Sequence, residues 1–224
     1  MRDMFTTVAP RYDFITWAFS FGMDSGWKQL AVERAGLPRS AVVLDLACGT
    51  GDFSKLVCRR DPSARTVAMD LTPSMLRIAR LPDPVCADAG SLPFADACFD
   101  AVFVGYGLRN FPDLQTVLRE VRRVLKPGGV LASLDFSLPR GALIRQIYLA
   151  YLYLQGALWG LLLHGKPRVY TYIPDSLRSF LSAADLSSLL ATLGFYQVDA
   201  RTFIAGGIAI HWARNPRTES ADIK

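Results

Sequence analysis

Residues 41–54 read AVVLDLACGTGDFS, a short apolar run followed at once by a turn that holds two glycines. The apolar run is typical of a buried strand, and the residues after the turn continue as a helix to about Arg60. A strand, a glycine turn and a helix in this order are the first step of an alternating α/β fold. Open sheets of this kind bind ligands beyond the carboxyl ends of their strands, so residues 45–54 are the first candidates for a binding site.

The alternation of strand and helix patterns continues along the chain. Further strands are predicted at 65–70, 84–88, 99–105, 130–137, 196–204 and 207–213, with helices at 73–80, 112–125 and around 186–193. Several of these strands are apolar almost throughout, which is typical of a parallel sheet covered by helices on both faces. We therefore expect an α/β fold with a doubly wound, mostly parallel sheet of seven strands that ends in an antiparallel pair.

Composition narrows the class of protein. Hydrophobic residues make up 51% of the 224 residues and charged residues 20%, which excludes intrinsic disorder. The net charge of +5 is spread along the chain without interleaved aromatic residues, so we expect no nucleic-acid partner. The four cysteines stand ten or more residues apart, and together with two histidines they predict no metal site.

One domain is expected over residues 1–214, followed by a flexible tail at 215–224. It begins with a helical segment at 1–38 and contains a helical insert at 140–180. Within the insert, residues 142–163 are apolar enough to span a bilayer, but Arg145 makes spanning costly. The segment is predicted to form one or two helices that either belong to the core or lie on lipid. The first ten residues carry no apolar signal segment, which favours a cytoplasmic protein that reaches a membrane only peripherally.

Residues after the first two strands indicate a nucleoside ligand. A dinucleotide fingerprint, G-x-G-x-x-G, would need a third glycine where this chain has Ser54. Asp70 ends the second strand, 25 residues beyond Asp45, where a carboxylate can accept hydrogen bonds from both hydroxyls of a ribose. The D-x-A-x-G-T-G pattern at 45–51 resembles motif I of S-adenosylmethionine-dependent methyltransferases with the seven-stranded fold.

Three further motifs carry a closer resemblance. They are YDFITWAFSFGMDSGW at 12–27, GLRN at 107–110, and RVLKPGG at 123–129 with DFS at 135–137. Together they resemble the ubiquinone/menaquinone biosynthesis C-methyltransferases, over about residues 4–212. The chain departs from that family's pattern at Ile15, Thr16 and Asp24, and it has Asp135 where the family has Glu.

The resemblance implies S-adenosylmethionine as the cofactor and a set of residues around it. The predicted cofactor-binding residues are Asp45, Gly49, Thr50, Gly51, Asp70, Leu71, Asp88, Ala89 and Gly105. The segment at 1–38 would act as a lid, and the insert would face the acceptor and lipid. The predicted acceptor-side residues are Tyr12, Arg109, Asn110, Asp135 and Tyr172. Arg109 would stabilise a phenolate and Asp135 would take a proton, while Asn110 either contacts the ligand or caps the following helix.

The predicted reaction is C-methylation of a prenylated naphthoquinol in menaquinone biosynthesis. Three alternatives remain: the prenylated benzoquinol of ubiquinone biosynthesis, an oxygen or nitrogen acceptor on a soluble small molecule, and a noncatalytic protein that binds S-adenosylmethionine. The acceptor must be the reduced quinol, because a quinone has no hydroxyl whose ionisation makes the adjacent carbon nucleophilic. The expected partners are the quinol, a membrane surface and a second copy of the chain in a homodimer.

Overall fold

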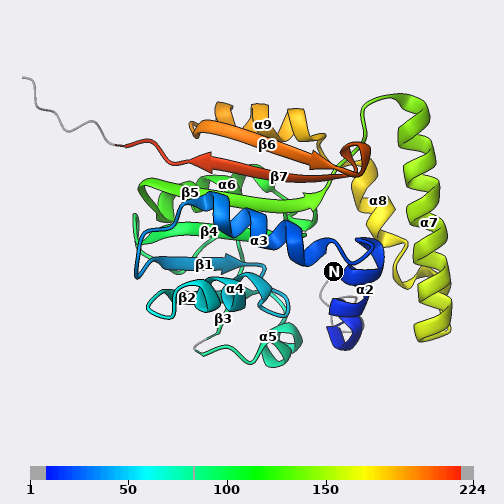
Figure 1. Ribbon diagram of the computed structural model, residues 1–224, viewed down its shortest axis with the longest axis horizontal. Coiled ribbons are helices and arrows are strands. Elements are labelled where there is room, and N and C mark those ends of the chain that lie inside the picture. Colours follow the sequence, from blue (N-terminus) through cyan, green and yellow to red (C-terminus); the bar gives the residue numbers. More distant parts are fainter. Residues whose placement is uncertain (1–8, 83, 218–224) are drawn as a thin grey trace, which may run out of the picture.

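The computed structural model describes residues 9–82 and 84–217. At its centre lies one sheet of seven strands in the order β3-β2-β1-β4-β5-β7-β6, as Figure 1 shows. The strands are β1 (Val42–Leu46), β2 (Arg65–Asp70), β3 (Val85–Cys86), β4 (Phe99–Gly105), β5 (Leu125–Phe136), β6 (Tyr196–Phe203) and β7 (Ile208–Arg214). The pairs among β1 to β5 are parallel, while β7 runs antiparallel to both β5 and β6. The predicted doubly wound, mostly parallel sheet is confirmed.

Helices cover both faces of this sheet because its central strands are apolar on both sides. On one face α3 (Asp24–Ala35) and α4 (Asp52–Arg60) share a core cluster with Val43. On the other face α6 (Leu114–Val124) and α9 (Ala183–Thr192) share a second cluster with Leu44. Successive strand residues point to opposite faces, so each strand contributes to both clusters. The short α5 (Pro73–Ala79) packs beside β2 and β3.

Three helices gather at the edge of the sheet where the parallel strands end (Figure 1). They are α2 (Tyr12–Phe19), α7 (Ala142–His164) and α8 (Tyr172–Arg178). Short 3-10 turns lie at Ala9–Arg11, Leu108–Asn110, Pro167–Val169 and Ile204–Gly206. The stretch predicted as one or two helices is a single helix, α7, which buries one narrow stripe, Tyr148, Leu152, Gly156 and Gly160. The edge of the sheet where the parallel strands end is therefore covered by helices from both the N-terminal segment and the insert.

The structure corrects the boundaries of two predicted strands. β5 begins at Leu125 and not at residue 130, because Leu125 pairs with Phe99 ahead of an irregularity in the β4 pairing. β3 is only two residues long. The Asn215 amide nitrogen donates to the Leu125 carbonyl at 2.8 Å, so the first residue of the predicted tail is bound to the start of β5. Residues 218–224 lie outside the described residues.

Candidate functional site

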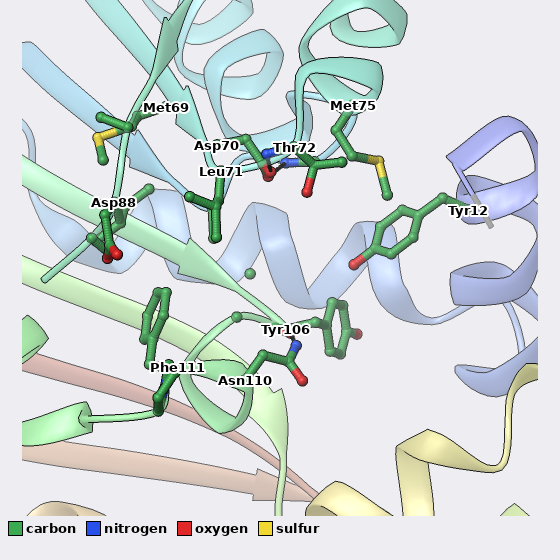
Figure 2. Close-up of a pocket in the computed structure, with 18 residues that line it drawn as sticks. Tyr12, Met69, Asp70, Leu71, Thr72, Met75, Asp88, Tyr106, Asn110 and Phe111 are labelled. Atoms are coloured by element: carbon green, nitrogen blue, oxygen red, sulfur yellow. Dashed lines mark hydrogen bonds between the residues drawn. The ribbon is translucent and has the colours of Figure 1, made fainter. Parts of the chain in front are cut away.

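A cavity of about 160 Å³ lies at the carboxyl ends of β1, β2, β3 and β4. Six of the nine predicted cofactor residues line it, namely Gly49, Asp70, Leu71, Asp88, Ala89 and Gly105. Figure 2 shows Asp70 and Leu71 on one wall, Phe111 and Asn110 on the opposite wall, and Tyr12 reaching in from α2. The rule that ligands bind beyond strand ends therefore located this cavity from the sequence.

Asp70 is held in one orientation by backbone donors. Its Oδ2 accepts from the Gly49 N–H at 3.0 Å and its Oδ1 from the Thr72 N–H at 2.8 Å. Burial raises the pKa of Asp70, and these hydrogen bonds oppose the rise. The Thr72 hydroxyl and the Leu71 N–H also contribute hydrogen bonds to Asp70. The carboxylate is therefore fixed in one orientation at the cavity wall, as an acceptor for a ligand hydroxyl.

The glycine turn depends on backbone conformations that favour glycine. Gly51 precedes α4 with φ at +82°, and a Cβ built there would lie 2.4 Å from Leu81. Gly51 lines neither this cavity nor the smaller one beside it, so it shapes the turn. The neighbouring Thr50 donates its hydroxyl to Asp13 of α2 at 2.7 Å. This bond ties the turn to the N-terminal helical segment.

A second, smaller cavity of about 20 Å³ adjoins the first, and both share the walls Tyr12, Ala47, Gly105 and Tyr106. The remaining two predicted cofactor residues, Asp45 and Thr50, line this smaller space. Asp45 is buried, and its Oδ2 accepts from both the N–H and the hydroxyl of Ser54 at 2.9 Å. Burial raises the pKa of Asp45 to about 7, and the two bonds from Ser54 oppose that rise.

Arg109 and Asp135 form a buried ion pair beside the larger cavity. Arg109 donates from a terminal nitrogen to Asp135 Oδ1 at 2.5 Å and to the Tyr106 carbonyl at 2.8 Å, and the two charged side chains are 3% and 4% exposed. Neither residue lines the larger cavity. Burial raises the pKa of Asp135 although Arg109 lowers it. Asp135 also accepts from the backbone N–H of Arg109 and of Phe136, so it fixes the position of this arginine.

Two buried polar atoms next to this pair have no hydrogen-bond partner among the described residues. They are Arg109 Nε, a donor, and Asn110 Oδ1, an acceptor. The Asn110 amide nitrogen donates to the Tyr106 carbonyl at 3.1 Å, and α6 is capped instead by Asp113, which accepts from the Thr116 N–H. The capping role considered for Asn110 is therefore wrong. A buried donor and a buried acceptor left unpaired point to a polar ligand.

Tyr12 and Tyr172 approach the same arginine from different elements. Tyr12 comes from α2 and Tyr172 from the start of α8, and the two phenols influence each other electrostatically. Burial raises the pKa of both phenols, while the charge of Arg109 lowers it and a hydrogen bond from Arg109 reaches Tyr172. Both tyrosines therefore stay protonated at neutral pH. The structure brings together the predicted acceptor-side residues, although only Tyr12 and Asn110 line the larger cavity.

The sequence interpretation missed several residues of the two cavities. Tyr106 follows the last residue of β4, adopts φ of +56° and donates its hydroxyl to Asp24 at 2.7 Å. The strand-end rule could have found it one residue beyond Gly105. Lys28 lines the smaller cavity. The sequence pattern that could have indicated it is the spacing of Lys28 four residues before the apolar Val32, which places Lys28 on the face of α3 that packs on the core. Other missed wall residues are Leu46, Ala47, Met69, Thr72, Met75, Ala87, Gly107, Phe111 and Pro112 in the larger cavity, and Cys48, Asp52 and Phe53 in the smaller.

The residues of the larger cavity fit S-adenosylmethionine by their chemistry. Asp70 offers an oriented carboxylate for a ribose, and Leu71 and Phe111 supply apolar walls for a base. Asp88 accepts from the Gly90 N–H at 2.8 Å at the end of β3. An acidic lining also suits a ligand with a positively charged sulfonium.

Comparisons with known proteins agree with this geometry. A sequence model of the ubiE/COQ5 methyltransferase family matches residues 1–215. The chain is 38% identical over 219 residues to the ubiquinone/menaquinone biosynthesis C-methyltransferase UbiE of Desulfotalea psychrophila, covering 95% of this chain and 89% of that protein. It is 37% identical over 222 residues to the demethylmenaquinone methyltransferase of Thermus thermophilus, covering 95% and 100%.

Solved structures share the fold at low identity. A SAM-dependent methyltransferase from Thermotoga maritima matches with a TM-score of 0.66 at 18% identity. The match covers 96% of this chain and 100% of that chain. Phosphoethanolamine N-methyltransferase 2 of Haemonchus contortus, in complex with S-adenosyl-L-methionine, matches with a TM-score of 0.67 at 16% identity, covering 91% and 56%. The predictions of family, fold, enzyme class and cofactor are confirmed. The chain belongs to the ubiE/COQ5 methyltransferase family and is an enzyme that transfers a methyl group from S-adenosylmethionine.

Proposed function

We propose that this enzyme methylates a ring carbon of a prenylated naphthoquinol, converting demethylmenaquinol to menaquinol. The observation that carries the proposal is a pair of buried atoms that have no hydrogen-bond partner within residues 9–82 and 84–217, namely Arg109 Nε and Asn110 Oδ1. A quinol hydroxyl can donate to the amide oxygen, and its phenolate can accept from the guanidinium. The relatives named as demethylmenaquinone methyltransferases support the same acceptor class.

Arg109 would act on the charge that develops on the acceptor. S-adenosylmethionine supplies a methyl group on a sulfonium, which is already a good leaving group. A phenol with a pKa of about 10 must ionise before its neighbouring carbon becomes nucleophilic, and a fixed cation favours the ionised form. Asp135 would hold Arg109 in place, because both of its oxygens are bonded to Arg109 or to the backbone. The proton would then pass to water or to Asp135.

The proposed cofactor and acceptor roles divide the site between two sets of residues. Asp70, Leu71, Asp88, Ala89 and Gly105 would bind the nucleoside, and Gly49, Thr50, Gly51 and Asp45 would form or support the turn beside it. Tyr12 and Tyr172 would donate hydrogen bonds to the acceptor. We propose that α2 acts as the lid over this single domain, since it holds both Tyr12 and the Asp13 partner of the glycine turn.

An anaerobic assay tests the function and the redox state of the acceptor together. Purified enzyme is given S-adenosylmethionine and a demethylnaphthoquinone with a short prenyl tail, with and without dithionite, and the product is analysed by mass spectrometry. We expect a C-methylated product only with the reductant. A parallel reaction with the prenylated methoxybenzoquinol measures the ubiquinone alternative. Equal product from the oxidised quinone would contradict the mechanism, and methyl on oxygen would move the enzyme to the small-molecule class.

In the same assay Arg109→Lys keeps the charge but loses the planar fork, so we expect a lower kcat with unchanged cofactor affinity. Arg119→Lys is the matched control, because Arg119 lies on the exposed side of α6 and, in the part of the chain that the structure describes, donates a hydrogen bond only to Gln115. Equal losses of cofactor affinity and kcat in Arg109→Lys would show that Arg109 is structural. No turnover of either quinol by the wild type would move the enzyme to the small-molecule class of acceptors.

We also propose that the enzyme works peripherally at the cytoplasmic face of a membrane. Helix α7 is long and apolar enough to cross a bilayer by length and composition, with 22% of its most apolar window buried. Its outer face is apolar, and Leu143 and Leu154 are each 70% exposed. Trp17 and Phe21 near α2 extend this surface, and Phe21 stacks on Tyr151 of α7 at 5.6 Å between ring centroids.

Charge favours lipid as the occupant of this face. Four basic residues, Arg140, Arg145, Lys166 and Arg168, are exposed along and beside α7, and the sequence has no acidic residue from 138 to 174. An apolar helix face with a basic border fits the surface of an anionic membrane. Because α2 and α7 stand at the edge where the parallel strands end, a prenylated acceptor could pass from lipid to the site (Figure 1).

A further inference from the structure

Lys28 is a buried cation on α3 that has no role in the function proposed above. The residue is 5% exposed, and its Nζ lies 2.5 Å from Asp24 Oδ2 and 2.6 Å from Asp52 Oδ2. Burial alone would lower the pKa of this amine, but the two carboxylates raise it above its ordinary value. Lys28 is therefore charged at neutral pH, between an acid one turn earlier on α3 and the first residue of α4.

The smaller cavity places this cation beside the larger one. Lys28, Asp45, Thr50 and Asp52 line the smaller cavity and not the larger, whereas Asp70 and Asp88 line only the larger. The two cavities share four wall residues, so they lie side by side, the larger at the nucleoside end and the smaller as a polar end. Among the described residues that line either cavity, Lys28 is the only one with a positive side chain.

The chemistry of S-adenosylmethionine calls for such an end. Its methionyl group ends in an α-carboxylate and an α-ammonium, and both ions lose water when they are buried and need charged partners. The walls of the larger cavity offer no cation for the carboxylate. The combined charge of Asp24, Lys28 and Asp52 is −1. The methionyl group is a zwitterion and does not change this charge, and the positive sulfonium of the same ligand balances it.

We propose that Lys28 binds the α-carboxylate of the methionyl group and that Asp52 binds its α-ammonium. The ligand then inserts into the Lys28–Asp52 ion pair, and each side chain exchanges its partner for the oppositely charged end of the ligand. Asp24 keeps Lys28 in place during this exchange, since it contacts Lys28 directly and also accepts from the Tyr106 hydroxyl of the shared wall. Asp52 is free to turn toward the ligand because its side chain is 37% exposed.

Two ligands that differ only at the amino-acid end test the proposal by calorimetry. S-adenosylhomocysteine carries the zwitterion, while 5′-methylthioadenosine has the same nucleoside and thioether sulfur without it. We expect Lys28→Met to weaken the binding of S-adenosylhomocysteine by about tenfold or more, and the binding of methylthioadenosine by less than about twofold. Asp70→Ala should weaken the binding of both ligands to the same extent, because both contain the ribose.

A nearby lysine supplies the matched control. Lys55 contacts the same turn, donating to the Thr50 carbonyl at 2.8 Å, but it lines neither cavity. Lys55→Met should therefore leave the affinity ratio of the two ligands at its wild-type value. If Lys28→Met does not fold, Asp52→Asn carries the test, since its carboxylate is partly exposed and its loss leaves Lys28 paired with Asp24.

The ratio of the two affinities decides the outcome. A selective loss of S-adenosylhomocysteine binding in the folded variants supports the proposal. Equal losses for both ligands, or no loss for either, would overturn it and leave Lys28 as a residue that only joins α3 to α4. The result does not depend on the quinol, because neither ligand nor measurement involves the methyl acceptor.

Discussion

At the scale of single residues, Asp45 shows how burial sets a pH dependence. Burial raises its pKa to about 7, whereas an unfolded chain has an ordinary aspartate pKa of about 3.9. The folded protein therefore keeps a proton that the unfolded chain releases. The contribution of Asp45 to stability is fully present below about pH 4 and is lost as the pH rises through about 7, at up to about 1.4 kcal/mol per pH unit.

Replacing Asp45 by Asn should remove this pH dependence. We expect the free energy of unfolding of Asp45→Asn to fall less steeply than that of the wild type between pH 5 and 8, and to equal or exceed it at pH 8. Urea denaturation at a series of pH values measures both. Asp61→Asn is the control, because hydrogen bonds from Ser40 and Ser63 lower the pKa of this exposed residue and it titrates below that range. Parallel curves for wild type and Asp45→Asn would contradict the assignment.

At the scale of elements, the sequence predicted strands and helices well where an apolar pattern extended along the whole element. β2 and β4 have the bounds expected from their apolar runs. The start of β5 was missed because Pro127 and two glycines look like a helix stop followed by a loop. The structure instead continues the strand through them, and Asn215 from the chain's far end bonds the carbonyls of Leu125 and Lys126. A partner that distant cannot be read from a local pattern.

Helix α7 shows a second limit of the sequence. The sequence predicted one or two helices at 142–163, and the structure has one that contains Gly156 and Gly160, although glycine weakens a helix interior. In the structure both glycines lie where α7 touches the backbone of residues 166–171. They are required by close packing between elements, which local propensity does not report.

This contact predicts the effect of adding one methyl group. A Cβ at Gly160 would lie 2.6 Å from the Lys166 carbonyl oxygen, so Gly160→Ala should destabilise the protein by about 1–3 kcal/mol. Gly26→Ala in α3 is the control, because a Cβ there meets nothing within 4 Å and should stabilise the helix by about 0.5–1 kcal/mol. Urea denaturation of both variants compares them. A Gly160→Ala variant as stable as Gly26→Ala would show that the backbone after α7 can move away from the added methyl group at little cost in free energy.

At the scale of the whole molecule, the site could be predicted only as far as its residues follow strand ends. Asp70 and Gly105 each end a strand, and their place in the sequence was enough to bring them to one cavity. Lys28 comes from a helix before the first strand, and its position beside Asp52 depends on how α3 packs on α4. Arg109 was found in its loop, but its pairing with Asp135 needed the register of β4 and β5.

The orientation of the molecule on a membrane is the prediction that involves all of these elements. Helix α7 and the aromatic side chains on and near α2 lie together at the edge where the parallel strands end, since Phe14 contacts Trp159 and Phe21 stacks on Tyr151 (Figure 1). Exposed apolar and basic side chains gather on and beside these helices. Each basic side chain near an anionic membrane contributes about 1 kcal/mol, and salt weakens that part of binding while the apolar part remains. We therefore expect the wild type to float with phosphatidylglycerol vesicles, less in high salt, and poorly with phosphatidylcholine alone.

The variants for this experiment follow from exposure. Leu143, Ile147 and Leu154 are all exposed on α7, and changing the three to Ser should abolish flotation while leaving turnover of a short-tailed quinol intact. Ile78→Ser is the control, because Ile78 is exposed on α5 and away from α7. Light scattering adds a second readout: if the triple variant changes a dimer into a monomer and the wild type does not float, the face binds a second copy of the chain. Flotation equal to that of the wild type would show that lipid binds elsewhere, because the loss of three large side chains from a lipid-bound face removes most of its apolar contact.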